Sequence, residues 1–238
     1  RTRLMLSTRN DVKAYLDFVN KYGDIPSAHI GIDTSQHTTF NIENRKGMYA
    51  AVEHLIKVHN RRKIAFISGI PGVYEADERF IAYQKALIDN DIPFNPQYVF
   101  QGDYLRKSGS LAIKEFLDER KISFDALVGA NDRIALYAMT ELQNRGYKIP
   151  EDISIVGFDD LSSAKSHYPT LTTVHQPLFD LGYMAIKEFS NKLITGSAKI
   201  EKYFLPAPLV IRDSCGHKLE NSEPVACPFN PSPVFERT

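Results

Sequence analysis

Residues 124–160 read FDALVGANDRIALYAMTELQNRGYKIPEDISIVGFDD, and this stretch decides the fold. Its first apolar run, Asp125 to Ala130, has no polar alternation, which is typical of a strand covered on both faces in a parallel sheet. Apolar residues then recur at three- and four-residue steps from Ile134 to Leu142, and Gly146 follows as a stop signal, which predicts a helix. Ile153 to Gly157 is a second apolar run and predicts a second buried strand.

Polar side chains close both predicted strands. Asn131 follows the first strand, and Asp159 and Asp160 follow the second. Because two strands joined by a helix lie parallel, we expect Asn131 and Asp159 at the same carboxyl edge of one sheet. Ligands of open α/β sheets bind at that edge. The alternative is that Asn131 and Asp160 act only as helix caps.

The rest of the chain repeats the same alternation. Apolar patterns predict strands at 4–7, 29–33, 38–42, 64–68, 98–100, 172–175, 203–205 and 209–211, and helices at 11–22, 46–58, 76–90, 108–120 and 178–194. Strands that alternate with helices of this length predict an α/β fold with parallel, doubly wound sheets.

Composition excludes several classes of protein. The formal net charge of the 238 residues is zero, so this segment has no electrostatic footprint for nucleic acid or an anionic membrane. No apolar run is long enough to span a bilayer, and the opening RTRLMLSTRND is not a signal peptide. The chain also lacks an initiator methionine, so we expect it to be part of a longer protein.

No metal site, cofactor site or catalytic motif is predicted. Cys215 and Cys227 lack metal-ligand spacing and are expected to be reduced thiols, and His54 and His59 are placed on one helix without an HExxH pattern. The glycine-rich turn at 69–72 is neither GxGxxG nor a P-loop, and GxSxG is absent. The adjacent carboxylates at 159 and 160 point in different directions, which does not suit a glycosidase pair. A non-enzymatic function is therefore expected.

Three motifs in one order resemble the effector-binding core of the lactose- and galactose-repressor family, which shares its fold with periplasmic sugar-binding proteins. They are AND at 130–132, IPEDISIVGFDD at 149–160 and PTLTTVHQP at 169–177. The resemblance implies a two-lobed periplasmic-binding-protein-like fold whose N-terminal lobe is incomplete. Residues 1–42 and 177–200 would form the partial N-terminal lobe, and 43–176 with 201–213 the C-terminal lobe. An irregular tail would follow at 214–238, where four prolines fall among the last fifteen residues.

The resemblance also implies a hinge between the lobes. The chain would cross near 42–45, near 175–178, and between the last helix and the final strands. Such a set of crossings lets a cleft close on a ligand.

By the same resemblance, six positions would contact the ligand. These are Arg79, Tyr104, Asn131, Asp159, Gln176 and, after a gap in the spacing, Asp33. An arginine fork binds two adjacent oxygens, an aromatic ring covers the apolar face of a sugar, and a carboxylate accepts hydroxyl protons. The alternatives are that Arg79 is a solvated side chain, that Tyr104 only covers the sheet edge, and that Gln176 only satisfies backbone groups.

The family resemblance predicts a cytoplasmic sensor that binds a sugar or related metabolite, forms a homodimer, and reads DNA only through a helix-turn-helix module outside this segment. VIRDSCGH at 210–217 instead resembles a subgroup in which an SCG motif precedes a C-terminal cyclase, kinase or helix-turn-helix module. The rival hypotheses are an extracytoplasmic solute-binding protein, a doubly wound enzyme, and a scaffold whose cleft binds nothing.

Overall fold

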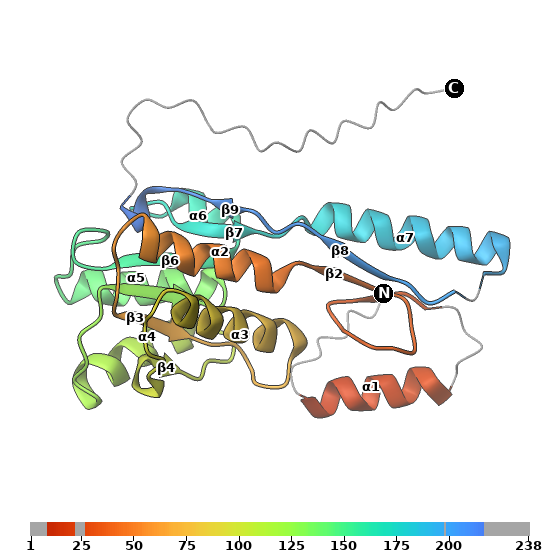
Figure 1. The fold of residues 1–238 in the computed structure, drawn as a ribbon, viewed down its shortest axis with the longest axis horizontal. Helices are drawn as coiled ribbons and strands as arrows, with labels where there is room; N and C mark the ends of the chain where they lie inside the picture. The colour runs from red at the N-terminus through yellow and green to blue at the C-terminus, as the bar shows by residue number, and fades with distance from the viewer. Residues whose placement is uncertain (1–8, 22–26, 198, 217–238) are drawn as a thin grey trace, which may run out of the picture.

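The computed structural model describes residues 9–21, 27–197 and 199–216, and these build two mainly parallel sheets with helices packed around them (Figure 1). The first elements are α1 (Arg9–Lys21), β1 (His29–Ile30), β2 (Thr39–Ile42), α2 (Asn44–Lys57), β3 (Ile64–Ile67), α3 (Tyr74–Asp89), η1 (Pro96–Tyr98), β4 (Val99–Phe100), α4 (Arg106–Lys114) and η2 (Glu115–Glu119). They are followed by β5 (Ala126–Gly129), α5 (Asp132–Asn144), β6 (Ser154–Asp159), α6 (Ser162–Ser166), β7 (Thr172–His175), α7 (Leu178–Thr195), β8 (Lys202–Leu205), β9 (Leu209–Val210) and η3 (Asp213–Cys215).

The larger sheet has the strand order β4-β3-β5-β6-β7-β9. Its strands are parallel except β9, which pairs antiparallel with β7. Alternate residues of β5 enter different cores: Val128 belongs to the cluster that includes residues of α2 and α3, and Leu127 to the cluster that includes residues of α4 and α5. Both faces are therefore apolar, which explains why the sequence shows no polar alternation here. The predicted α/β class with parallel sheets is confirmed.

The smaller sheet consists of β1, β2 and β8, all parallel. Figure 1 shows α7 running beside β8 and β2, with α1 nearby. All four residues of β8 pair with β2, from Thr39 with Lys202 to Ile42 with Leu205. Residues 201–213 were predicted to lie in the C-terminal lobe, which contains the larger sheet. This prediction is wrong for β8, and only β9 of this segment joins the larger sheet. A short strand does not reveal from its own residues which sheet edge will accept it.

Three connections join the two sheets side by side. They lie at Glu43 between β2 and α2, at Gln176-Pro177 between β7 and α7, and at 206–208 between β8 and β9. Glu43 N donates to Leu205 O at 2.8 Å, and His175 N donates to Pro208 O at 2.8 Å, so the segments are bonded to one another. The third crossing was predicted before the final strands, but it lies between them. The prolines at 206 and 208 end one strand before the next begins.

Smaller differences have local causes. The predicted helix at 108–120 is an α-helix only to Lys114 and continues as a π-helical turn, and the five-residue helix α6 was not predicted. At the start of the predicted tail, Ser214 and Cys215 are buried in η3. The predicted strand at 4–7 and the tail from 217 onward lie outside the described residues. None of the helices in the described segments is long and apolar enough to span a membrane.

Candidate functional site

Arg79 lies at the centre of the group of polar side chains at the carboxyl edge of the larger sheet. It projects from α3 and is only 2% exposed. Its Nε donates to Asn44 Oδ1 at 2.9 Å, and its Nη1 donates to Ala130 O at 2.7 Å. The guanidinium carbon is 3.7 Å from the centroid of the Phe158 ring, a cation–π contact. The alternative of a solvated surface arginine is therefore excluded.

Asp159, the last residue of β6, faces Arg79. Its Oδ1 is 3.6 Å from Arg79 Nη1 and accepts a hydrogen bond from Gln176 Nε2. Burial raises the pKa of Asp159 to about 6, although the Arg79 charge acts in the opposite direction. The backbone φ of Asp159 is +124° and that of Asp160 is +55°, so the chain leaves the strand through a conformation that L residues rarely adopt.

Asp160 points into a different network from Asp159. Its carboxylate bonds to Arg212 Nη2 at 2.5 Å and to His175 Nδ1 at 3.0 Å. The expectation that the two adjacent carboxylates diverge agrees with this geometry.

Asn131 has two roles. Its Oδ1 accepts from Ile134 N at 2.9 Å, which caps α5, and its Nδ2 donates to Tyr104 O at 3.3 Å. Capping is therefore part of its function but not all of it, because the same side chain also fixes the loop that carries Tyr104.

Tyr104 packs its ring against Gly69, the second residue after β3. A Cβ atom at Gly69 would lie 2.2 Å from the ring carbon Cζ, so only glycine lets the backbone approach this closely. Tyr104 itself has φ +65°, and burial raises the pKa of its phenol to about 12.

Two buried donors in this group have no hydrogen-bond acceptor among the described residues. They are Arg79 Nη2 and Tyr104 Oη. The only acid near Arg79 Nη2 in the described ion pairs is Glu75, whose Oε2 is 4.0 Å away, beyond hydrogen-bond distance. A buried polar group without a partner costs about 1 to 3 kcal/mol. A ligand that supplied oxygen atoms at these two donors would recover that free energy.

Asp33 stands apart from the other five predicted positions. Its Oδ1 forms an ion pair with Lys202 Nζ at 2.5 Å across the smaller sheet. Burial raises the pKa of Tyr74, the first residue of α3, to about 12, and nearby acids including Asp33 raise it further. The structure thus brings Arg79, Tyr104, Asn131, Asp159 and Gln176 together, whereas Asp33 is paired with Lys202 of β8.

Three members of the group were not predicted from sequence. Glu75 lies one helical turn before Arg79, and this four-residue spacing is a usable sequence signal. Asn44 and Phe158 touch the guanidinium from α2 and β6, and contacts between elements so far apart in the chain leave no local pattern.

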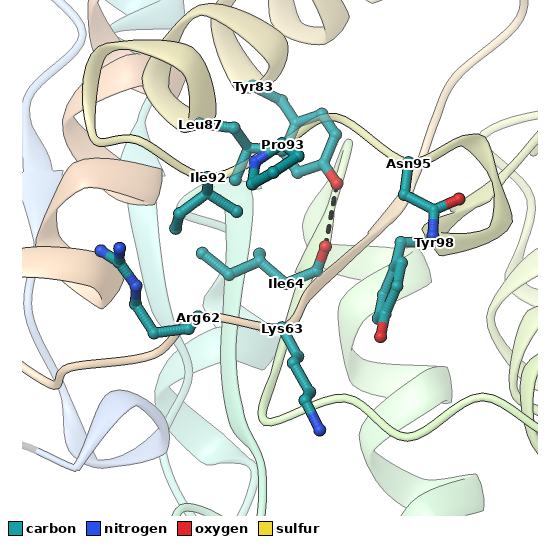
Figure 2. Close-up of a pocket in the computed structure, with 9 residues that line it drawn as sticks. All are labelled: Arg62, Lys63, Ile64, Tyr83, Leu87, Ile92, Pro93, Asn95 and Tyr98. Atoms are coloured by element: carbon teal, nitrogen blue, oxygen red, sulfur yellow. Dashed lines mark hydrogen bonds between the residues drawn. The ribbon is translucent and has the colours of Figure 1, made fainter.

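Two surface hollows among the described residues lie elsewhere. One is formed where the start of β3 meets the end of α3, and Tyr83 donates to Ile64 O at 2.8 Å in its wall (Figure 2). Apart from Arg62 and Lys63 at one side, Asn95 and the tyrosine hydroxyls, its lining is apolar. It opens at the amino end of β3, whereas ligands of open α/β sheets bind at the carboxyl ends.

Comparison with known proteins identifies the family. Residues 52–215 match the family described as the periplasmic binding protein-like domain. The chain belongs to this family. The matched residues include the five clustered side chains of the candidate site, so the site lies within the family's own fold.

The relatives are regulators of transcription. The chain is 31% identical over 189 residues to the HTH-type transcriptional repressor PurR of Aliivibrio fischeri, covering 78% of this chain and 56% of the repressor. Among solved structures, the transcriptional regulator CelR in complex with cellobiose is 28% identical with a TM-score of 0.78, covering 84% of this chain and 61% of that one. A sugar-binding regulator of the LacI family from Escherichia coli, complexed with phosphate, is 26% identical with a TM-score of 0.73, covering 87% and 81%. The predicted resemblance to the lactose- and galactose-repressor family is confirmed, and the chain spans 56% of the PurR repressor it matches.

Proposed function

We propose that this chain is the ligand-sensing domain of a transcriptional regulator and that it binds a sugar or a related polar metabolite at the carboxyl edge of the larger sheet. The observation that carries the proposal is the pair of unsatisfied buried donors, Arg79 Nη2 and Tyr104 Oη, beside the acceptor Asp159. Vicinal hydroxyl groups match such a set because each hydroxyl both donates and accepts. The LacI-family and CelR neighbours support this ligand class.

Gln176 would couple the ligand to the arrangement of the two sheets. It lies in one of the three connections and already bonds to Asp159. A ligand that contacts Asp159 and Gln176 together would favour one angle between the two sheets, because its binding free energy differs between the open and the closed arrangement of the lobes. The lobes proposed here are the two sheets with their helices, with β8 in the smaller lobe.

Dimerisation, a cytoplasmic location and DNA binding are parts of the same proposal. They are supported by the repressor relatives, and DNA would be read by a module outside this segment.

A thermal-shift screen tests this function with a matched pair of tyrosine variants. The panel is a set of mono- and disaccharides, including cellobiose, together with nucleosides. A binding compound present at 100 times its Kd stabilises the folded state by about 2.7 kcal/mol and raises the Tm. Tyr104→Phe removes an unsatisfied hydroxyl, so it should keep its own Tm while the ligand-induced shift shrinks.

The control is Tyr137→Phe, since the Tyr137 hydroxyl is exposed and already accepts a hydrogen bond from Arg106. It should show the full ligand shift. A panel that yields no ligand-specific shift, or an equal shift in Tyr104→Phe, contradicts the proposal.

A further inference from the structure

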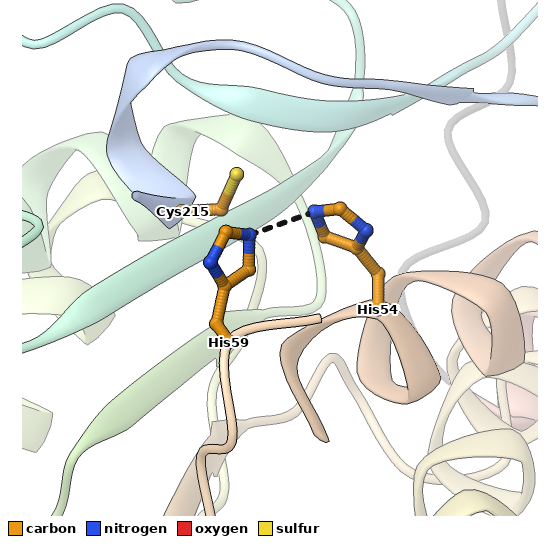
Figure 3. Close-up of side chains that lie close together, drawn as sticks. All are labelled: His54, His59 and Cys215. Carbon is orange, nitrogen blue, oxygen red and sulfur yellow. Dashed lines mark hydrogen bonds between the residues drawn. The ribbon is translucent and has the colours of Figure 1, made fainter. Parts of the chain in front are cut away.

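A second group of polar side chains lies at the opposite end of the larger sheet. His54 comes from the last turn of α2, His59 from the turn after that helix, and Cys215 from the end of η3 (Figure 3). The two histidines were expected on one helix, but α2 ends at Lys57, and this allows the chain to turn the His59 ring back onto His54. Their Nε2 atoms are 3.1 Å apart.

The cluster is separate from the candidate ligand site. Ser154, the first residue of β6, donates from its Oγ to Cys215 O at 2.9 Å, whereas Asp159 is the last residue of that strand. Five steps along a strand correspond to roughly 17 Å. The two groups therefore do not share a ligand.

The spacing of the three ligating atoms suits a metal ion. All of them lie within 4.8 Å of one another. Tetrahedral zinc, with Zn–N and Zn–S bonds of about 2.0 and 2.3 Å, places two nitrogens about 3.3 Å apart and a nitrogen and sulfur about 3.5 Å apart. The histidine pair is already close to this separation, and each distance from the thiol sulfur to a histidine nitrogen needs to shorten by about 1.3 Å at most.

The segment that carries the thiol is anchored by hydrogen bonds. Ser214 Oγ donates to Ile155 O at 2.6 Å and accepts from Thr172 N at 2.9 Å, so β6 and β7 both hold it. Gly216 has φ +101°, and a Cβ there would lie 3.3 Å from His59 Nδ1. A side chain at 216 would therefore be strained and would crowd the ring of His59.

The other end of the cluster is anchored as well. Arg61, two residues after His59, donates to Ser154 Oγ at 3.0 Å and to Pro150 O at 2.7 Å. Ser154 thus touches both the Cys215 segment and the His59 turn. Fixed supporting contacts of this kind hold ligands in the geometry that a metal requires.

We propose that His54, His59 and Cys215 bind one Zn²⁺ ion, with water as the fourth ligand. A thiolate and two imidazoles select zinc over the hard ions Mg²⁺ and Ca²⁺, which prefer oxygen ligands. On binding, the Cys215 thiol gives its proton to solvent and leaves the Arg212 carbonyl, to which it donates at 3.4 Å, and the thiolate sulfur bonds to the metal. Cys215 is fully buried and both histidines are partly exposed, so the ion enters from the histidine side. The bound ion fastens the end of η3 to α2.

The test is a titration of the full chain, purified without a histidine tag and stripped of metal by a chelator, with Zn²⁺ alone. Calorimetry should give one ion per chain. His59→Gln and Cys215→Ser should each weaken binding by about tenfold or more. His167→Gln, a histidine that contacts Thr140 on the surface, is the matched control and should leave the affinity unchanged.

Co²⁺ replaces Zn²⁺ to show the thiolate directly. In a Cys227→Ser background, in which Cys215 is the only thiol, Co²⁺ should produce a sulfur-to-cobalt charge-transfer band. The His59 ring is partly exposed, so His59→Gln is expected to fold and keeps the test valid if Cys215→Ser does not fold. No stoichiometric Zn²⁺ binding, equal affinity in His59→Gln, or a Co²⁺ spectrum without the thiolate band overturns the proposal.

Discussion

Asp159→Asn separates the role of Asp159 in binding from its role in the fold. The asparagine keeps the size of the side chain and an oxygen that accepts from Gln176, but it loses the negative charge that faces Arg79 at 3.6 Å. A charge-assisted hydrogen bond contributes about 1.5 to 3 kcal/mol. Losing one such bond to a ligand hydroxyl should raise the Kd by about 10- to 150-fold, since 1.4 kcal/mol corresponds to a factor of ten. Asp159→Ala should weaken binding at least as much.

The pH dependence sharpens this prediction. Only the ionised carboxylate accepts two hydroxyl protons, and the pKa of Asp159 is raised to about 6. Ligand affinity of the wild-type chain should therefore fall as the pH drops through about 6, while the affinity of Asp159→Asn stays flat. Calorimetric titrations at several pH values, with the ligand found in the screen, measure both effects.

A matched control distinguishes the site from general charge effects. Asp118 of η2 pairs with Arg145, the residue that follows α5, and Asp118→Asn should leave both affinity and its pH profile unchanged. The free energy of unfolding of Asp159→Asn should not fall more than about 1 kcal/mol below that of the wild type, because the hydrogen bond from Gln176 is kept. Unchanged affinity in Asp159→Asn would refute the assignment of the site.

Three further predictions concern stability and are measured by urea denaturation. Leu136→Ala should lower the free energy of unfolding by about 2 to 5 kcal/mol, because Leu136 is 7% exposed and packs in the core beside α4; an unchanged midpoint would contradict that packing. Burial raises the pKa of Asp132 to about 7 from 3.8, so the folded state holds this proton more tightly than the unfolded chain and stability is lost as the pH rises from about 4 to 7. Asp132→Asn keeps partners for Leu161 N and the Thr173 hydroxyl, and its free energy of unfolding should rise by about 2 to 4 kcal/mol relative to that of the wild type over that pH range. If the difference in free energy between the two proteins stayed constant with pH, Asp132 would be ionised throughout the range. Gly47→Ala should lower the free energy of unfolding by about 1 to 3 kcal/mol, because the new Cβ would lie 2.7 Å from Val174 Cγ1. The control, Gly182→Ala in α7, has open space at its Cβ and should raise the free energy of unfolding by about 0.5 to 1 kcal/mol. Equal effects of the two substitutions would mean that α2 is not packed this closely on β7.

The larger sheet was predictable because its signals are local. Strands such as β5 and β6 are apolar on both faces, and the helix between them has an N-cap at Asn131 and a glycine at 146 with φ +87°. Each signal lies within a few residues of the element it defines. The short strands of the smaller sheet carry no comparable information, and β8 was consequently assigned to the wrong sheet.

The candidate site was predictable only in part. Strand ends placed Asn131 and Asp159 at one edge, and the family resemblance added Arg79, Tyr104 and Gln176, which the structure brings together. Asp33 was included although Lys202 engages it in the smaller sheet, because spacing along the chain does not show which partner a side chain will find.

The sequence by itself determined the succession of strands and helices and the edge at which polar side chains gather, because hydrophobic period and strand direction are properties of neighbouring residues. Only the tertiary structure decided which distant groups meet. Arg79 is buried between Asn44 and the carbonyl of Ala130, and Cys215 lies beside His54 and His59. The burial of a side chain and the geometry of a three-residue cluster depend on how helices and strands pack, and packing brings together residues that no local sequence pattern links.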